Sequence, residues 1–146
     1  MESWEVAVRE SVRQTLADYT AATDSFDLAA LASCFTAAGT LEFTGARAPL
    51  VGPDQIEAGL RSQLSQAPSG KRPSYVRHHV SSVRFLRADA HEVETSSYFV
   101  VFTDIGVDHW GRYRDLLKPV GSRWLFKSRK IRVDGFAANS LMNNEQ

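Results

Sequence analysis

Four long β-type segments follow one another in the second half of the chain, with no helical segment between them. Each is rich in β-branched and aromatic residues, and short turn sequences such as "ADA", "DIG" and "VGS" separate them. The segments are residues 74–88, 91–104, 107–120 and 122–136. Because strands joined by such short turns pair antiparallel, this half of the chain predicts one antiparallel sheet.

The first half has the periodicity of helices instead. Helices are predicted in residues 3–22, in residues 23–35 and from Pro53 onward. Asp24 or Ser25 is the expected N-cap of the second helix, and residues 39–45 predict a short strand. Helices first and strands second, without βαβ alternation, indicate an α+β fold in which a curved antiparallel sheet wraps over the N-terminal helices.

The composition indicates one ordinary globular unit. No internal repeat or linker divides the 146 residues, so residues 1–146 are expected to form a single domain. Lys plus Arg and Asp plus Glu both number 17, which leaves no net charge to recruit nucleic acid or an anionic membrane. The basic cluster "KSRKIR" (127–132) is interpreted as solvated outer positions of a strand, with Arg132 turned elsewhere. No run approaches the roughly 18 apolar residues that cross a membrane, so we expect a soluble, cytoplasmic protein.

Neither a metal nor a cofactor is expected. Cys34 is the single cysteine, so no internal disulfide can form, and its apolar surroundings indicate a small buried side chain. His78 and His79 are adjacent on a strand and cannot converge on one ion, and no Glu/His spacing supplies other ligands. No glycine-rich phosphate loop is present.

The adjacent histidines in "YVRHHVSS" pose the question of which one faces the interior. The apolar residues that should face the core change parity along this strand, from Val76 and Val80 to Val83 and Phe85. A β-bulge near Ser81–Ser82 reconciles the two halves, because one extra residue switches the parity. We therefore predict that His78 points inward and that His79 points outward.

A further histidine lies in "VDHWGRYRDLL", where the odd positions from 107 to 117 share one face. His109 and Tyr113 can then both point into the interior. The alternative is that Val107 and Leu117 pack in the core while His109 lies exposed near the strand end. Periodicity leaves both interpretations open, and an inward histidine such as His78 can also be purely structural.

Five segments, which together extend over nearly the whole chain, have an order and spacing that can be compared with known families. They are "DYTAATDSFDLAALASCFT", "GTLEF", "VGPDQI", "RHHVSSVRF" and "GRYRDLLKPVGSRWLFKSRKIRVDGF". In this order they resemble the SnoaL-like branch of the nuclear transport factor 2 superfamily, with scytalone dehydratase, bile-acid dehydratase and polyketide cyclases as relatives. The resemblance implies a cone-shaped α+β barrel whose open end holds a mostly apolar ligand pocket.

The resemblance also implies site residues. Asp24 follows Tyr19 with the Tyr-x4-Asp spacing of bile-acid dehydratase, and His78 matches the pocket histidine of both dehydratases. The second histidine of scytalone dehydratase has no counterpart, since its position falls near Thr103, and Phe43 lies where a pocket tyrosine would be. The expected catalytic residues are His78, Asp24 and Tyr19, and the expected substrate-binding residues are His109, Tyr113, Phe43, Phe99 and Thr103.

These groups indicate acid–base chemistry. A neutral imidazole can take up a proton and return it, and a carboxylate such as that of Asp24 on the other ring nitrogen would fix the tautomer. Asp24 as a plain helix N-cap is the competing interpretation. We expect a cofactor-independent dehydratase, cyclase or isomerase that acts on a hydrophobic polycyclic or polyketide-like molecule.

Two further expectations concern partners. The alternative to an enzyme is a non-catalytic binding or assembly subunit, similar to the β subunit of ring-hydroxylating dioxygenases, because fold does not fix function. The segment "SYFVVF" (97–102) carries apolar residues of both parities, so one set must meet something other than the pocket. Because the relatives commonly pair sheet to sheet, we predict a homodimer.

Overall fold

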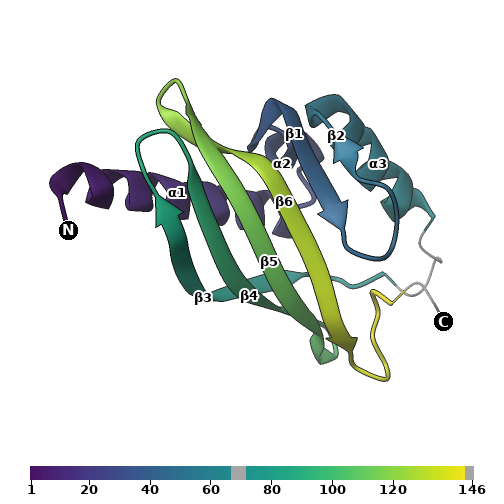
Figure 1. The fold of residues 1–146 in the computed structure, drawn as a ribbon. Helices are drawn as coiled ribbons and strands as arrows, with labels where there is room; N and C mark the ends of the chain where they lie inside the picture. Colours follow the sequence, from purple (N-terminus) through teal and green to yellow (C-terminus); the bar gives the residue numbers. More distant parts are fainter. Residues whose placement is uncertain (67–71, 144–146) are drawn as a thin grey trace.

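The computed structural model describes residues 1–66 and 72–143, and Figure 1 shows its helices beside one long curved sheet. The helices are α1 (Ser3–Asp24), α2 (Leu28–Ala32) and α3 (Pro53–Ser65). The strands are β1 (Phe35–Phe43), β2 (Leu50–Val51), β3 (Arg77–Ala88), β4 (Val93–Thr103), β5 (Gly106–Val120) and β6 (Arg123–Phe136). The predicted α+β class is confirmed.

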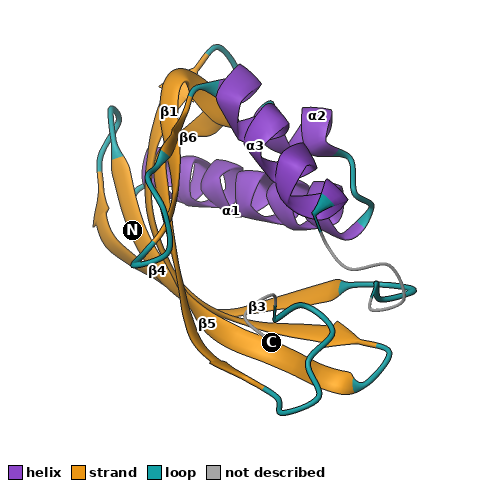
Figure 2. Ribbon diagram, turned by 90° about the vertical axis from the view of Figure 1, so that its right-hand side faces the viewer, coloured by secondary structure: helices purple, strands orange, loops and turns teal. Residues whose placement is uncertain are grey.

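The sheet has the strand order β2-β1-β6-β5-β4-β3. The strands β3 to β6 form an antiparallel meander, whereas β1 pairs with β6 in the parallel direction. The sheet is therefore mixed rather than wholly antiparallel, and with β2 and β3 as its two edges it stays an open cone instead of a closed barrel. Figure 2 shows the strong curvature and places all three helices on the concave side.

The core lies between α1 and the concave face of the sheet. The buried side chains of α1 recur at spacings of three and four and are Val12, Thr15, Leu16, Tyr19 and Ala22. The hydroxyl of Thr15 donates to the carbonyl of Trp124 and so attaches α1 to β6. The rings of Phe35 and Phe126 pack against Tyr19, and each such fully buried aromatic contributes roughly 1.5–3 kcal/mol.

The second helix is shorter than predicted. Its N-cap is Asp27, whose carboxylate accepts a hydrogen bond from the backbone N–H of Ala30 at 3.0 Å, so the predicted caps Asp24 and Ser25 were wrong. The expected helix also included residues 33–35, but β1 begins at Phe35, and Cys34 is buried outside the helix. The two-residue strand β2 is too short to show a period and was not predicted.

The strand β3 contains the bulge that the parity change predicts. Ser82 has a φ of 52°, and the register with β4 slips by one residue after Ser81. His78 is consequently half-buried on the inner face, whereas His79 is exposed and packs edge-on against the ring of Phe102 on the outer face. The predicted orientation of the two histidines is confirmed.

The basic cluster 127–132 lies only partly at the surface. Lys127, Lys130 and Arg132 are exposed, but Arg129 is fully buried, so the interpretation that Arg132 turns away from its neighbours was wrong. The Nε and Nη2 atoms of Arg129 donate to the two carboxylate oxygens of Asp115 at 2.9 and 3.2 Å. This bidentate pair compensates a buried charge that the sequence pattern alone would assign to solvent.

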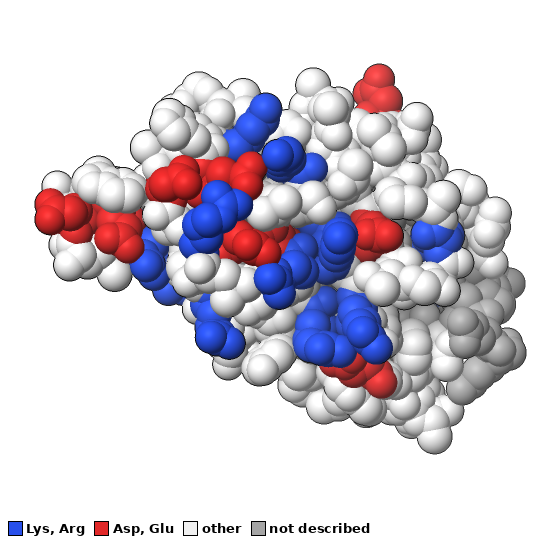
Figure 3. Space-filling model, viewed as in Figure 1, with Lys and Arg blue, Asp and Glu red and all other residues white. Residues whose placement is uncertain are grey.

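The outer face of the sheet is rich in charge, and Figure 3 shows Lys and Arg side chains gathered over its middle, with Asp and Glu among them. A shallow cavity of about 330 Å³ lies there, and its basic lining residues are Arg112, Arg114, Lys130 and Arg132. Glu94 pairs with Arg114 and Asp134 with Arg112, which neutralises part of this charge.

Two expectations fall partly outside the described residues. From its composition, a Pro/Gly/Ser-rich loop is expected to close the third helix, and this loop includes residues 67–71. The C-terminal tail, residues 137–146, has no clear period and is expected to fray or to pack on a neighbour, and it includes residues 144–146. Within the described ranges, no helix combines the length and apolar character that spanning a membrane requires.

Candidate functional site

The centre of the candidate site is a contact between His78 and Asp24, which lie far apart in the sequence. The Nδ1 atom of His78 lies 2.6 Å from Oδ1 of Asp24, and the backbone N–H of His78 donates to both carboxylate oxygens at 3.2 and 3.1 Å. An ionised carboxylate can only accept, so Nδ1 carries the proton and Nε2 is left as the basic nitrogen. The side chains remain 11% and 15% exposed, respectively, which leaves both within reach of a ligand.

The position of Asp24 is unfavourable for the helix that supplies it. Asp24 is the last residue of α1, and a carboxylate at a helix C-terminus opposes the partial negative charge of the helix dipole. Helix stability therefore does not explain the residue, and neither does capping, since α2 is capped by Asp27. The bonds from His78 give the carboxylate its partners instead.

A second histidine–carboxylate pair lies on β5. Nδ1 of His109 is 2.8 Å from Oδ1 of Asp108, which is fully buried. Asp108 also accepts bonds from the Thr103 hydroxyl at 3.0 Å, the Ser140 hydroxyl at 2.6 Å and the Leu141 backbone N–H at 2.8 Å. This carboxylate thus joins β4, β5 and the C-terminal segment.

The surroundings shift the pKa values of this second pair. Burial alone would raise the pKa of Asp108, but hydrogen bonds from Ser140, His109, Leu141 and Thr103 together hold it below its usual value. Burial lowers the pKa of His109 and outweighs the opposing effect of the Asp108 carboxylate. The ring is therefore neutral at pH 7, with Nδ1 bonded to Asp108 and Nε2 available as a base.

The ring of Phe99 neighbours both histidines, which pair with Val101 from the two sides of β4. Its centroid lies 6.4 Å from that of His78 and 6.2 Å from that of His109, and it stacks on Tyr113 at 4.7 Å. Gly111 pairs with Phe99 across the strands, and a Cβ there would lie 2.7 Å from the Phe99 ring. The glycine therefore provides the space that the ring of Phe99 occupies.

Beneath Phe99 the interior is filled by aromatic rings around Arg129. The guanidinium of Arg129 lies 3.6 Å from the ring centroid of Tyr113 and 4.2 Å from that of Tyr19. Both tyrosines are buried, and burial raises the pKa of each phenol, so both stay protonated. Tyr19 thus lies deeper than the histidine–carboxylate pairs.

The structure brings together most of the predicted residues but not all of them. His78, Asp24, Phe99, His109, Tyr113 and Thr103 form one connected cluster. Thr103 lies near the position of the second histidine of scytalone dehydratase, and here its hydroxyl donates a hydrogen bond to Asp108. Phe43 lies apart, since its strand β1 is separated from β3 by β6, β5 and β4, and Arg47 covers its ring.

A bulge in β5 explains why Asp108 was missed. Val101 pairs with His109 and Phe102 with Val107, so Asp108 is an extra residue and is buried together with its neighbour. Strict alternation places Asp108 outside and Val107 inside, whereas Val107 is exposed. The alternative in which His109 is exposed and Val107 packs is therefore wrong. The signal in the sequence is an aspartate directly before a histidine. Its inward position can be inferred only when the bulge is known.

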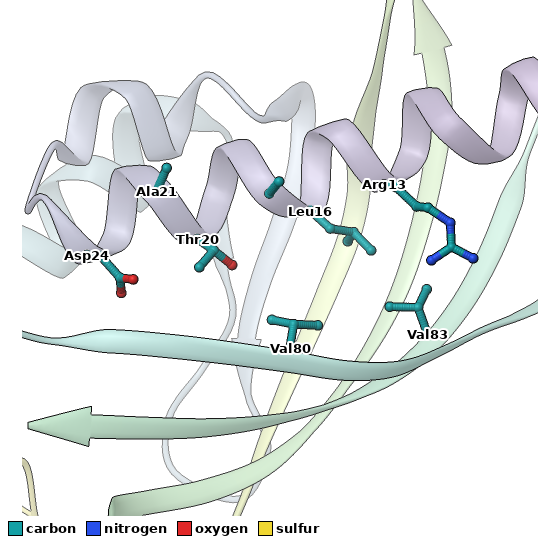
Figure 4. A pocket seen from close by; sticks show the side chains of 8 residues that line it. Arg13, Leu16, Thr20, Ala21, Asp24, Val80 and Val83 are labelled. Carbon is teal, nitrogen blue, oxygen red and sulfur yellow. The ribbon is translucent and has the colours of Figure 1, made fainter. Parts of the chain in front are cut away.

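A groove of about 510 Å³ runs between α1 and β3 and reaches this cluster at one end (Figure 4). Asp24 lies at that end and Arg13 at the other. The side chains along it are mostly small or apolar and are Leu16, Ala17, Thr20, Ala21, Val80 and Val83. Its volume is in the usual range for a small-molecule site.

An open α+β cone with polar groups at one end of an apolar groove is a small-molecule-binding fold. The chain belongs to the SnoaL-like family, because the model of the SnoaL-like domain matches residues 4–130. A comparison with the curated proteins finds no match.

Solved structures agree with this assignment. A Catenulispora acidiphila protein in complex with S-DNPA is 25% identical, with a TM-score of 0.76 over 88% of this chain and 95% of that one. Aln2 from a Streptomyces species is 27% identical, with a TM-score of 0.72 over 86% and 90%. A Novosphingobium aromaticivorans protein provisionally named a scytalone dehydratase is 17% identical, with a TM-score of 0.74 over 88% and 85%, and shows a likeness of fold alone.

Proposed function

We propose that the chain is a cofactor-independent lyase or isomerase that acts on a hydrophobic polycyclic or polyketide-like molecule. The observation that carries the proposal is the 2.6 Å contact between His78 and Asp24 at the end of an apolar groove. The backbone bonds from His78 hold the carboxylate, and the carboxylate in turn orients the ring. Nε2 of His78 is then the proton carrier, and Asp24 is a positioning residue.

A dehydration illustrates the chemistry. Nε2 of His78 takes a proton from the carbon beside a substrate carbonyl, and the electrons of that C–H bond form the new double bond as the C–O bond breaks. The imidazolium then returns the proton to the departing hydroxide, so that water leaves and the histidine is restored. One positioned acid–base group of this kind contributes roughly 10²- to 10⁴-fold to the rate.

His109 is the second proton carrier in this proposal. Its Nδ1 is bonded to Asp108, and the lowered pKa keeps the ring neutral at pH 7. Both imidazoles neighbour the ring of Phe99, so a substrate held against that ring would lie close to both. Reactions that need a proton removed at one atom and delivered at another would use both.

The test is a screen of hydroxylated polycyclic and polyketide-like compounds with wild-type protein and with His78→Ala. Product formation is followed by absorbance and mass spectrometry. The proposal predicts turnover of at least one compound by the wild type and its loss in His78→Ala, with ligand-induced NMR shifts at Asp24 and Phe99. Equal turnover by both proteins would contradict it.

A non-catalytic binding or assembly subunit is the second candidate. One observation favours it: side chains, namely Tyr19, Tyr113 and the buried Arg129–Asp115 pair, fill the interior below Phe99. This candidate predicts ligand binding without turnover across the screen. The predicted homodimer, expected through the outer face of the sheet, and the predicted cytoplasmic location are compatible with either candidate.

A further inference from the structure

We propose that the groove between α1 and β3 binds an elongated apolar molecule with one anionic group, and that Arg13 holds this group. The inference rests on the proposed function in placing the reacting end of the molecule at Asp24 and His78. It adds the substrate class, which is an apolar acid, and the residue that selects this acid, which is Arg13.

The shape and lining of the groove support an apolar occupant. Leu16 of α1 lies on one side of the groove, and Val80 and Val83 of β3 lie on the other, as Figure 4 shows. Ala17 of α1 also lines the groove. Val80 shares the inward parity of His78, and the bulge at Ser82 keeps Val83 on the same face, so the wall continues past the point where a regular strand would turn Val83 out. Burying such surface on a ligand contributes about 25 cal/mol per Å² before the costs of binding.

Among the described residues, the charge at the far end of the groove has no ionic partner. Arg13 contacts the ring of Phe85 at 5.2 Å but forms no ion pair with any residue in 1–66 or 72–143. Arg9, one turn earlier, covers the same ring at 4.7 Å, and its charge is paired with Glu5 at 2.8 Å. Two arginines with the same aromatic contact thus differ in whether their charge is neutralised.

The two ends of the groove give the occupant an orientation. Arg13 and Asp24 lie on the same helix, and a rise of about 1.5 Å per residue separates them by about 16 Å. An anion at the Asp24 end would be repelled by the carboxylate, whereas the guanidinium of Arg13 attracts it. The charged group therefore binds at Arg13, and the uncharged part of the molecule extends toward His78.

The experiment compares two fluorescent probes of matched size, 1-pyrenebutyrate and the neutral 1-pyrenebutanol. Their dissociation constants are measured by fluorescence anisotropy with wild type, Arg13→Gln and the matched control Arg9→Gln. We expect the acid to bind about fivefold more tightly than the alcohol to wild type and to Arg9→Gln, the size of one partly exposed ion pair. Arg13→Gln should remove this preference and leave the affinity for the alcohol unchanged.

A third variant tests the location independently of charge. Ala17 is exposed on α1 and lines the groove, so Ala17→Trp should fill it and weaken both probes at least tenfold without disturbing the core. Failure of wild type to bind either probe, equal binding of acid and alcohol, the same loss in Arg9→Gln and Arg13→Gln, or unchanged binding in Ala17→Trp would overturn the inference. If wild type selects the acid but turns over no compound in the screen, the proposed function alone is contradicted and the inference stands.

Discussion

At the scale of single residues, two carboxylates hold two imidazole rings in the same way. In both pairs Nδ1 meets the carboxylate, which leaves Nε2 of His78 and of His109 as the reactive nitrogen. The supports differ, because Asp24 is held by the backbone of His78 and Asp108 by side chains and backbone of three segments. Asp108 is therefore the more firmly fixed of the two.

The first prediction concerns the proton carrier. Once a substrate is known, His78→Ala should lower kcat by at least about 10²-fold, because a positioned acid–base group contributes roughly that much. Asp24→Asn should lower kcat less if it only orients the ring, although loss of the tautomer alone can be severe. The control is His79→Ala, which removes a neighbouring histidine from the outer face and should leave kcat unchanged. Full turnover by folded His78→Ala, checked by circular dichroism, would exclude His78 as the carrier.

The second prediction concerns pH and stability. The folded pKa of His109 lies below the ordinary value of about 6.5, so between the two the unfolded chain binds more protons than the folded chain. The free energy of unfolding should therefore fall as the pH is lowered through 6.5, and His109→Gln should reduce this fall. Urea unfolding at pH 7.5 and 5.5 measures it. The same substitution at the exposed His91 should leave the pH dependence as in wild type; an equal effect of both substitutions would contradict the assignment.

At the scale of elements, two β-bulges decide which side chains reach the site. The bulge at Ser82 keeps Val83 on the inner face with His78, and the bulge at Asp108 buries this carboxylate beside His109. Without either bulge, alternation would place one half of the strand, and part of the site, on the wrong face.

The third prediction tests the first of these bulges. Ser82 is exposed with a φ of 52°, a conformation that a β-branched residue tolerates poorly. Ser82→Val should therefore lower the free energy of unfolding by about 1–3 kcal/mol, whereas Ser82→Gly should change it by less than about 1 kcal/mol. Chemical denaturation measures both. Ser81→Val is the control, since Ser81 is exposed on the regular part of the same strand; a cost as large as that of Ser82→Val would contradict the conformational explanation.

The strands and the bulges also show how much of the fold could be predicted from the sequence. The four long strands could be predicted to within three residues at each end, because each has β-type composition between clear turn signals. The bulge at Ser82 could be predicted because apolar residues on both sides record the change of parity. The bulge at Asp108 could not, because the adjacent Val107 is apolar but exposed and so gives a misleading signal.

The remaining errors come from contacts between distant residues. Arg129 looks like a surface residue until Asp115 is placed beside it, because the carboxylate that compensates its charge lies on another strand. The parallel pairing of β1 with β6 likewise depends on partners at opposite ends of the chain. The depth of Tyr19, which is buried against the rings of Phe35, Tyr113 and Phe126, could not be predicted either, because spacing along a helix does not give depth.

At the scale of the whole molecule, the outer face of the sheet exposes apolar side chains that the helices do not cover. Tyr98 is 55% exposed there, next to Arg112 across the strands, and the half-buried side chains Val100 and Phe102 share its parity. Paired charges surround these residues, so an apolar strip lies within a polar rim, as in many protein–protein interfaces.

The fourth prediction concerns association through this face. Wild-type protein should have twice the 16.2 kDa chain mass in light scattering at micromolar concentration. Tyr98→Glu should shift it toward the monomer, because it introduces a charge into the strip at its most exposed side chain, whereas Leu86→Glu on the edge strand should not. A monomeric wild type would contradict the prediction.

The parallel pairing of β1 with β6 has a consequence for the order of folding. The meander β3 to β6 is made of neighbours in the sequence and can form early, because its loops are short. The helices and β1 leave the ribosome first, but Phe35 pairs with Phe126, and the hydroxyl of Thr15 bonds to the carbonyl of Trp124, only after the last strand exists. During synthesis the N-terminal segment must therefore wait for its partner, with the apolar face of α1 exposed until β6 has been made.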